Sequence, residues 1–124
     1  MEREELTIMY LQMAGLDYHT ASMEQREPFS FSKEQQETIL KTLKDSVQGV
    51  VLLNTCNRTE LYLSSDVPCQ PSQWLLQFAK ETHSSIESVP FYEKSGIAAA
   101  RHIIEVACGL HSQVLHEEQI VTQV

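Results

Sequence analysis

Cys56 is the residue of this sequence with the clearest chemical potential, because it stands among groups that can bind an anion or a polar substrate. Thr55 and Asn57 flank it directly, and Arg58 follows Asn57. A cysteine is a nucleophile only as the thiolate, and a nearby cation favours that form. The four apolar residues 50–53 precede this group, and such a run fits a strand that is covered on both faces. The sequence therefore predicts a buried strand that delivers a thiol and a cation into a polar turn.

Two strands are expected on either side of this turn, at 49–54 and 59–64. Side chains alternate between the two faces of a strand. Along the second strand, Leu61 and Leu63 are therefore expected on one face and Glu60 and Tyr62 on the other.

The rest of the chain supplies further elements that could position the turn. Residues 6–13 indicate a first strand, 15–22 a break and 23–27 a short helical turn. A capping-box pattern at 32–35 and an apolar stripe predict a helix over 33–45. A helix starting at Pro71, a short strand over 89–93, a helix capped by Ser95 that stops at Gly109, and a helical segment from about 112 complete the set.

The order strand, helix, strand, strand, helix, strand predicts an α+β fold. It matches the split βαβ, ferredoxin-like arrangement, an antiparallel sheet with helices mainly on one face.

Length and composition favour one compact domain over 1–124, or a piece of a larger protein. The net charge of −8 is unusual for a free-standing nucleic-acid binder, so any contact with RNA is expected to be local. Three widely spaced cysteines, no leader-like start and no long apolar run favour a cytoplasmic protein that is not anchored in a membrane.

Four segments resemble the N-terminal catalytic domain of the glutamyl-tRNA reductase family, in the same order along the chain. They are the turn Thr55-Cys56-Asn57-Arg58-Thr59-Glu60 and the stretches 15–27, 100–110 and 111–124. The resemblance implies a ferredoxin-like domain that precedes separate NADPH-binding and dimerisation domains, so the segment from about 112 is expected to begin a longer helix.

The resemblance implies an enzyme of tetrapyrrole (porphyrin and heme) biosynthesis. Such an enzyme reduces the glutamyl group of glutamyl-tRNA to glutamate-1-semialdehyde with NADPH. Cys56 is then expected to form a thioester with the glutamyl group, and His102 to assist in catalysis. Splitting one difficult step into two easier ones is the general benefit of such an intermediate. The substrate-binding residues implied are Thr55, Asn57, Arg58, Ser112, Glu117, Glu118, Gln119 and Gln123.

The resemblance also implies partners and a cofactor. We expect glutamyl-tRNA as substrate, a homodimer for the full-length enzyme, and an encounter with the glutamate-1-semialdehyde aminomutase that acts next. No glycine-rich dinucleotide loop is visible, so NADPH is assigned to a domain outside these residues. His111, His116 and Glu117 fit no strong zinc pattern, and we expect no metal.

Two other interpretations stay open. His111, His116, Glu118 and Thr122 stand where the family usually has aspartate, glycine, proline and glycine. The chain is therefore alternatively a non-catalytic relative that serves as a binding or regulatory module. A cysteine hydrolase unrelated to tRNA is a third and weaker hypothesis.

Overall fold

The computed structural model describes residues 9–109 and 120–123. Within them the elements follow in the order β1 (Tyr10–Asp17), α1 (Met23–Arg26), η1 (Glu27–Phe29), α2 (Lys33–Lys44), β2 (Gly49–Asn54), β3 (Arg58–Ser65), α3 (Pro71–Lys80), β4 (Tyr92–Ser95), α4 (Ile97–Ala107) and β5 (Ile120–Gln123).

The sheet is antiparallel throughout, with strand order β4-β1-β3-β2-β5. The first four strands reproduce the ferredoxin-like order, which confirms the predicted fold class. β1 and β3 are the central pair, and their register sets Gly15 opposite Glu60 and Asp17 opposite Arg58.

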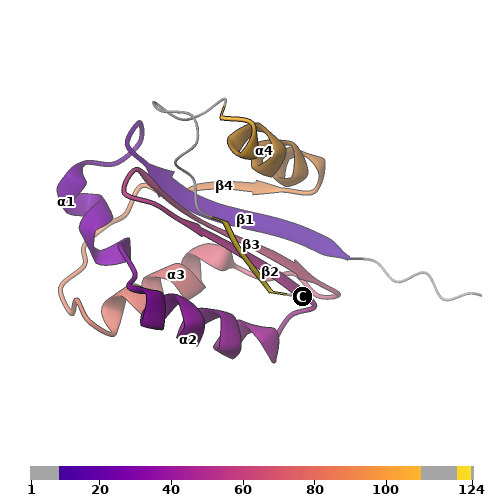
Figure 1. Cartoon of the computed structure of the whole chain (residues 1–124), viewed down its shortest axis with the longest axis horizontal. Coiled ribbons are helices and arrows are strands. Elements are labelled where there is room, and N and C mark those ends of the chain that lie inside the picture. The colour runs from indigo at the N-terminus through magenta and orange to yellow at the C-terminus, as the bar shows by residue number, and fades with distance from the viewer. Residues whose placement is uncertain (1–8, 110–119, 124) are drawn as a thin grey trace, which may run out of the picture.

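Helices cover both faces of this sheet unequally (Figure 1). α2 and α3 lie against one face, and α4 lies alone among the described helices against the other. The main core is between the sheet and the α2–α3 layer, where Leu61 and Leu63 of β3 pack with Leu43 and Leu75. A much smaller apolar cluster, with Met13, Tyr62 and Ala99 at its centre, lies under α4. The predicted alternation along β3 is therefore confirmed.

The helix boundaries follow local signals. Ser32 accepts a hydrogen bond from the backbone of Gln35, whose side chain in turn accepts one from the backbone of Ser32, so the predicted capping box is present. α3 begins at Pro71, as expected. The cap residue of α4 is Gly96, with φ 61°, and not Ser95, because Ser95 is the last residue of β4.

Several strand boundaries differ from the prediction. β1 continues through Gly15 to Asp17, so the expected break at 15–22 starts too early, and residues 6–8 of the expected strand lie outside the described part. β4 begins at Tyr92 and not at Val89, so Pro90 precedes the strand. Proline lacks the backbone N–H that a strand ladder uses.

Residues 120–123 were expected in a helix, and this expectation is wrong. They form β5, which pairs antiparallel with β2 from Leu53 opposite Ile120 to Val50 opposite Gln123. Ile120, Val121 and Thr122 are β-branched and therefore favour a strand. Without β5, β2 would be an edge strand with unpaired backbone groups, and residues 120–123 pair with these groups. Residues 112–119 of the expected helix lie outside the described residues.

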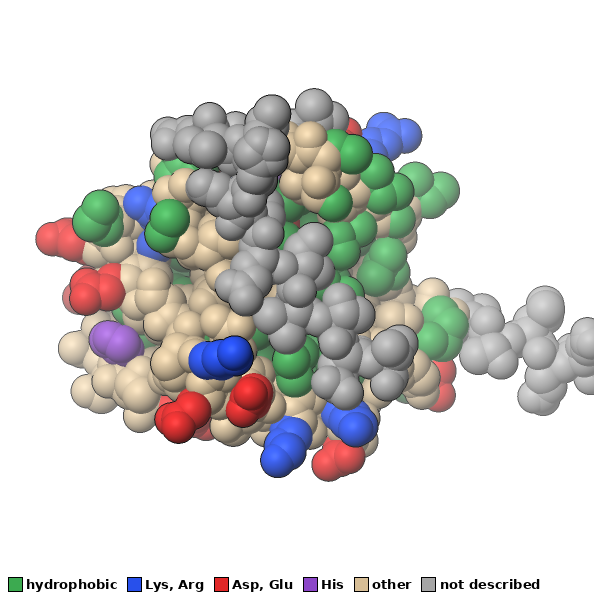
Figure 2. All heavy atoms as spheres, viewed as in Figure 1, with side chains coloured by type: hydrophobic (Ala, Val, Ile, Leu, Met, Phe, Trp, Pro, Cys, Tyr) green, Lys and Arg blue, Asp and Glu red, His purple; other side chains and the backbone are tan. Residues whose placement is uncertain are grey.

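The outer surface of α4 carries exposed apolar side chains. Figure 2 shows hydrophobic atoms gathered above the sheet in this view, and the large exposed ones on α4 are Ile97 and Ile104. No helix in the ranges 9–109 and 120–123 is long and apolar enough to cross a bilayer.

Candidate active site

Cys56 lies at the tip of a three-residue turn between β2 and β3, and its side chain is exposed. The turn is organised by Thr55. Its hydroxyl accepts hydrogen bonds from the backbone N–H groups of Asn57 and Arg58, both at 3.2 Å, and its own N–H donates to the Arg58 carbonyl at 2.8 Å. The polar residues around Cys56 therefore hold the backbone of the turn in place beneath the thiol.

The turn is also tied to the segment that follows β1. The backbone N–H of Tyr18 donates to the Asn57 carbonyl at 3.0 Å. The guanidinium of Arg26, at the end of α1, donates to the Cys56 carbonyl at 3.4 Å. Among the described residues, Arg26 is therefore a cationic side chain that hydrogen-bonds to the backbone of Cys56. The proximity of Arg26 to Cys56 was not anticipated from the sequence.

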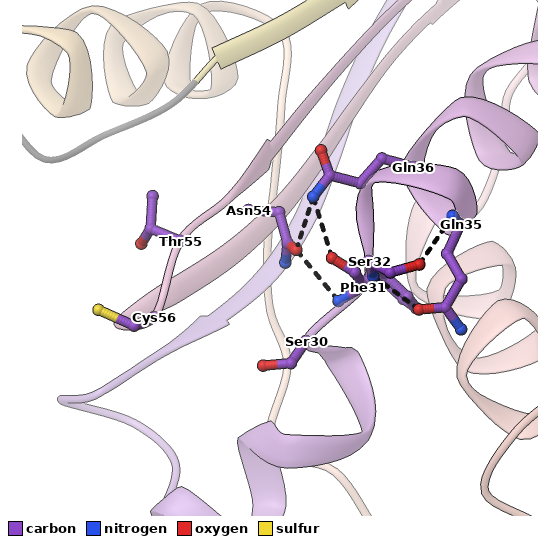
Figure 3. A pocket seen from close by; sticks show the side chains of 8 residues that line it. All are labelled: Ser30, Phe31, Ser32, Gln35, Gln36, Asn54, Thr55 and Cys56. Atoms are coloured by element: carbon purple, nitrogen blue, oxygen red, sulfur yellow. Dashed lines mark hydrogen bonds between the residues drawn. The ribbon is translucent and has the colours of Figure 1, made fainter.

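A hollow of about 730 Å³ opens beside the thiol (Figure 3). In Figure 3, Cys56 lies at one side of this hollow with Sγ pointing away from Gln36, and the Ser30 hydroxyl points towards the same side. Its lining consists of Ser30, Phe31, Ser32, Gln35, Gln36, Asn54, Thr55 and Cys56.

Asn54 fixes the wall of this hollow. Its amide nitrogen donates to the Phe29 carbonyl at 2.9 Å and to the Thr59 hydroxyl at 2.6 Å. Its oxygen accepts from the Phe31 backbone at 3.1 Å and from Gln36 at 3.3 Å. The end of β2 is thus locked to the segment that enters α2, which keeps the hollow open next to the cysteine.

A buried polar cluster lies on the other face of the sheet, under α4, and Glu60 is its centre. The carboxylate accepts hydrogen bonds from Tyr62 at 2.6 Å, from Tyr92 at 2.5 Å and from Arg58 at 3.0 Å. His102 of α4 lies with Nε2 at 2.7 Å from the same carboxylate. Glu60 is 0% exposed, so these four partners replace all of its hydration.

The charge of the cluster follows from these contacts. Burial by itself raises the pKa of Glu60, but the hydrogen bonds from His102, Tyr62 and Tyr92 outweigh it and leave the pKa of Glu60 below its ordinary value. Burial and the adjacent carboxylate raise the pKa of both tyrosines well above 10. Burial opposes the charged form of Arg58, yet the Glu60 carboxylate prevails and the pKa of Arg58 is raised. Glu60 and Arg58 therefore form a buried ion pair, and both phenols stay protonated.

The side chain of Glu60 packs directly against Gly15 of the neighbouring strand β1. A Cβ atom at this position would be 2.6 Å from Glu60 Cγ, 2.8 Å from the Thr59 carbonyl oxygen and 3.2 Å from a Tyr92 ring carbon. Only a residue without a side chain allows the carboxylate to approach β1 this closely.

A second hollow, of about 500 Å³, adjoins this cluster at the end of the sheet where β1 ends. Asp17 lies in its wall, with one carboxylate oxygen 3.6 Å from the Arg58 guanidinium. Its lining consists of Asp17, His19, Thr20, Tyr92, Lys94, Ala98, Arg101, His102 and Glu105. The lining therefore contains both acidic and basic side chains, and it includes His102 as well as Asp17, which lies next to Arg58.

The predicted substrate-binding and catalytic residues do not all lie at the exposed turn. Thr55, Cys56 and Asn57 share the exposed turn, whereas Arg58 is 1% exposed and already bound to Glu60. Ser112, Glu117, Glu118 and Gln119 lie outside the described residues, and Gln123 is described only by its backbone pairing in β5.

Glu60 and Tyr92 connect the predicted histidine to the sheet, and the sequence did not suggest a role for either. A glutamate directly before the apolar residues Leu61 and Leu63 of the predicted strand is the signal that could have drawn attention to Glu60. In the described ranges, no group of three or more His, Cys, Asp or Glu side chains is arranged to hold a metal ion.

Comparison with known proteins bears directly on this site. The family described as glutamyl-tRNAGlu reductase, N-terminal domain, matches residues 14–124. A glutamyl-tRNA reductase of Alcanivorax borkumensis is 42% identical over 93% of this chain and 28% of its own length. A "Probable multifunctional siroheme biosynthesis protein HemA" of Ruminiclostridium josui is 41% identical over 99% of this chain and 25% of its own length.

A solved structure is similar as well. The glutamyl-tRNA reductase from Methanopyrus kandleri superimposes with a TM-score of 0.58 and 29% identity, over 83% of this chain and 23% of that one. The chain thus spans about a quarter of the length of these three relatives. Because the family match includes the cysteine turn, the Glu60 cluster and α4, the chain belongs to the family of glutamyl-tRNAGlu reductase N-terminal domains.

Proposed function

We propose that this chain is the catalytic domain of a glutamyl-tRNA reductase and that Cys56 accepts the glutamyl group of glutamyl-tRNA. The observation that carries the proposal is the exposed thiol on a rigid turn at the edge of a hollow. A structural cysteine is usually buried among apolar side chains, whereas Cys56 is exposed and lies in a polar turn. The membership of the chain in this family supplies the substrate class.

The proposed step is an acyl transfer. The Cys56 thiolate attacks the carbonyl carbon of the aminoacyl ester and forms a C–S bond. The bond between that carbon and the ribose oxygen of the tRNA breaks, and the oxygen takes up a proton as it leaves. The product is a glutamyl thioester on Cys56, which is more easily reduced than the ester.

Arg58 is our candidate for binding the free carboxylate of the glutamyl group. In the structure the place beside its guanidinium is held by Asp17 at 3.6 Å, on the wall of the second hollow. A substrate carboxylate that enters this hollow would replace Asp17 next to Arg58 and lie close to His102. Thr55 and Asn57 are candidates for contacts nearer the thiol, and Ser112, Glu117, Glu118, Gln119 and Gln123 for contacts to the glutamyl group or the tRNA end.

The described residues do not fit NADPH. A dinucleotide site requires several glycines at a strand-to-helix turn, and the connection from β4 to α4 contains the single glycine Gly96. We therefore assign NADPH, and the reduction to glutamate-1-semialdehyde for tetrapyrrole biosynthesis, to a separate domain of the full-length protein. Homodimerisation, contact with the aminomutase and a cytoplasmic location belong to the same proposal.

The test uses the 124-residue chain and tRNA charged with radiolabelled glutamate. Wild type and Cys56→Ser are incubated with the charged tRNA, denatured at mildly acidic pH, and assayed for label that stays on the protein. We expect label on the wild type and none on the variant, with unchanged thermal unfolding because the thiol is exposed. Cys108→Ser, which removes another exposed thiol, is the matched control and should retain the label.

Equal labelling of Cys56→Ser would contradict the proposal. A wild-type chain that binds charged tRNA but never becomes labelled would favour the non-catalytic binding module instead.

A further inference from the structure

Arg26 is a cationic side chain beside Cys56, and the acyl transfer proposed above gives it no part. Its Nη1 donates to the Cys56 carbonyl at 3.4 Å, and its Nε donates to the Ser22 carbonyl, also at 3.4 Å. Ser22 is the N-cap of α1, the short helix that carries Arg26, so the second bond helps to hold the guanidinium against the cysteine turn. Both partners are neutral carbonyl groups, which fix the position of the positive charge without neutralising it.

Arg26 and Arg58 differ in their charge partners. The guanidinium of Arg58 is buried and lies 3.0 Å from Glu60 and 3.6 Å from Asp17. Arg26 is half-buried, and no carboxylate of the residues that the structure describes forms an ion pair with it. Of these two arginines, Arg26 is therefore the one that can bind an anion without the loss of an ion pair.

The hollow beside Cys56 offers polar groups of a different kind. The described residues that line it contribute hydroxyl and amide groups and no charged side chain (Figure 3). The amide nitrogen of Gln36 donates to the Phe31 carbonyl at 3.0 Å and to Asn54 Oδ1 at 3.3 Å, so the amide oxygen of Gln36 can accept a hydrogen bond from a ligand. The surroundings of Cys56 thus combine a neutral polar wall with one cation, which suits a ligand that has both uncharged polar groups and an anionic group.

We propose that Arg26 binds the phosphate of the 3′-terminal nucleotide of the tRNA and so positions the ester at Cys56. The inference rests on the proposed function for the identity of the substrate. The ester is carried by the terminal ribose, and the nearest phosphate of the tRNA is attached to that same ribose. A nucleotide whose ester reaches the thiol therefore brings this phosphate close to the cysteine turn. A guanidinium can bind a phosphate through two parallel N–H bonds.

The overall charge of the chain makes such a contact important. With a net charge of −8, the chain has little general attraction for the RNA backbone. Phosphate contacts fix the position of a nucleic acid on a protein without reading its sequence. A single cation next to the nucleophile can therefore place the reacting end of the tRNA while the rest of this surface attracts RNA only weakly.

The first measurement is the affinity for deacylated tRNA, which requires no acyl transfer. Wild type, Arg26→Gln and Arg26→Lys are compared by fluorescence anisotropy between about 50 and 200 mM salt. We expect Arg26→Gln to bind about tenfold more weakly, and its plot of log affinity against log salt concentration to be shallower by about 0.7, the value for one single-stranded phosphate contact. Arg26→Lys keeps the charge and should keep the wild-type slope.

Lys41→Gln is the matched control, because it removes one positive charge from an exposed position of α2. It should leave the affinity and the salt slope unchanged. If Arg26 only supports the cysteine turn, Arg26→Gln will keep the wild-type slope, and that result overturns the inference. A wild-type chain that does not bind tRNA overturns it as well.

The place of the contact is tested with tRNA that lacks the 3′-terminal nucleotide together with its phosphate. We expect wild type and Arg26→Gln to bind this shortened RNA equally, because the partner of Arg26 is missing. A difference that persists would show that Arg26 acts elsewhere on the tRNA and would overturn the inference.

Glutamyl transfer to Cys56 separates the phosphate from the glutamyl group. With charged tRNA, Arg26→Gln should raise the concentration for half-maximal rate about tenfold and leave the maximal rate unchanged, since the phosphate is not at the reacting bond. With glutamyl-adenosine, an ester that has no phosphate, both chains should react equally. A slower reaction of Arg26→Gln with this small ester would assign Arg26 to the glutamyl group and overturn the inference. If the wild-type chain transfers no glutamate from either ester, the proposed function fails, and the binding measurements still decide the role of Arg26.

Discussion

Gly15→Ala is the substitution for which the structure gives the sharpest expectation of instability. The new Cβ atom would lie 2.6 Å from Glu60 Cγ and 2.8 Å from the Thr59 carbonyl oxygen. Carbon atoms pack at about 3.5–4.0 Å, so both contacts are severe. The Thr59 oxygen belongs to the backbone of the neighbouring strand, and it can move only if β1 and β3 separate.

The expected cost has two parts. Overpacking of a filled interior costs about 1–3 kcal/mol. A displaced Glu60 would also weaken its bonds to His102 and Arg58, and a hydrogen bond to a charged group is worth about 1.5–3 kcal/mol. We therefore expect Gly15→Ala to lower the free energy of unfolding by about 3 kcal/mol or more, measured by urea denaturation followed by circular dichroism.

Gly49→Ala is the matched control, because Gly49 is also a strand glycine. Its nearest neighbour for a new Cβ is Ser64 Cβ at 3.4 Å, an ordinary contact. Alanine restricts the unfolded chain and is expected to leave the free energy of unfolding within about 1 kcal/mol of the wild type. If Gly15→Ala unfolds at the same urea concentration as Gly49→Ala, the argument that Glu60 needs the missing side chain at Gly15 is refuted.

Three further predictions concern the buried polar groups. Asn54→Ala removes four hydrogen bonds at the wall of the cysteine hollow and is expected to cost about 2–4 kcal/mol, seen as a lower urea midpoint. The raised pKa of Tyr62 means that its stabilising contribution is complete below pH 10 and is lost as the pH rises above 10, where only the unfolded chain ionises at this residue. Tyr62→Phe has no phenol to ionise, so over the same rise in pH it should lose less stability than the wild type, by up to about 1.4 kcal/mol per pH unit. The lowered pKa of Glu60 has the opposite sign, so the destabilisation by Glu60→Gln should be full at pH 7 and shrink as the pH falls below 4.5, measured by urea denaturation across that range.

Local patterns in the sequence were sufficient for most of the fold. The capping box before α2, Pro71 at the start of α3 and the alternation of Leu61 and Leu63 each involve neighbours within a few residues. Such patterns report which face of an element is buried, and the order of the elements then restricts the sheet to a small number of topologies.

The polar cluster could not be predicted in the same way. Glu60 meets Tyr92 and His102 across 32 and 42 residues of sequence, and no local pattern links them. Gly15 was interpreted as a strand break because glycine usually weakens a strand, whereas here the strand needs it to receive Glu60. Arg58 was expected to bind substrate, and only the tertiary structure reveals that its guanidinium already lies next to the carboxylates of Glu60 and Asp17.

The unequal cores on the two faces of the sheet have a consequence for how the molecule opens. Among the residues that the structure describes, the α2–α3 face is held by an apolar cluster of fifteen buried residues, whereas the apolar cluster under α4 has three. Local opening follows the least buried area, so α4 should detach from the sheet at a lower free energy than α2 or α3. Such an opening would carry His102 away from Glu60 while the cysteine turn keeps its shape. Amide hydrogen exchange would then report two separate units, one that holds the nucleophile and one that carries the histidine.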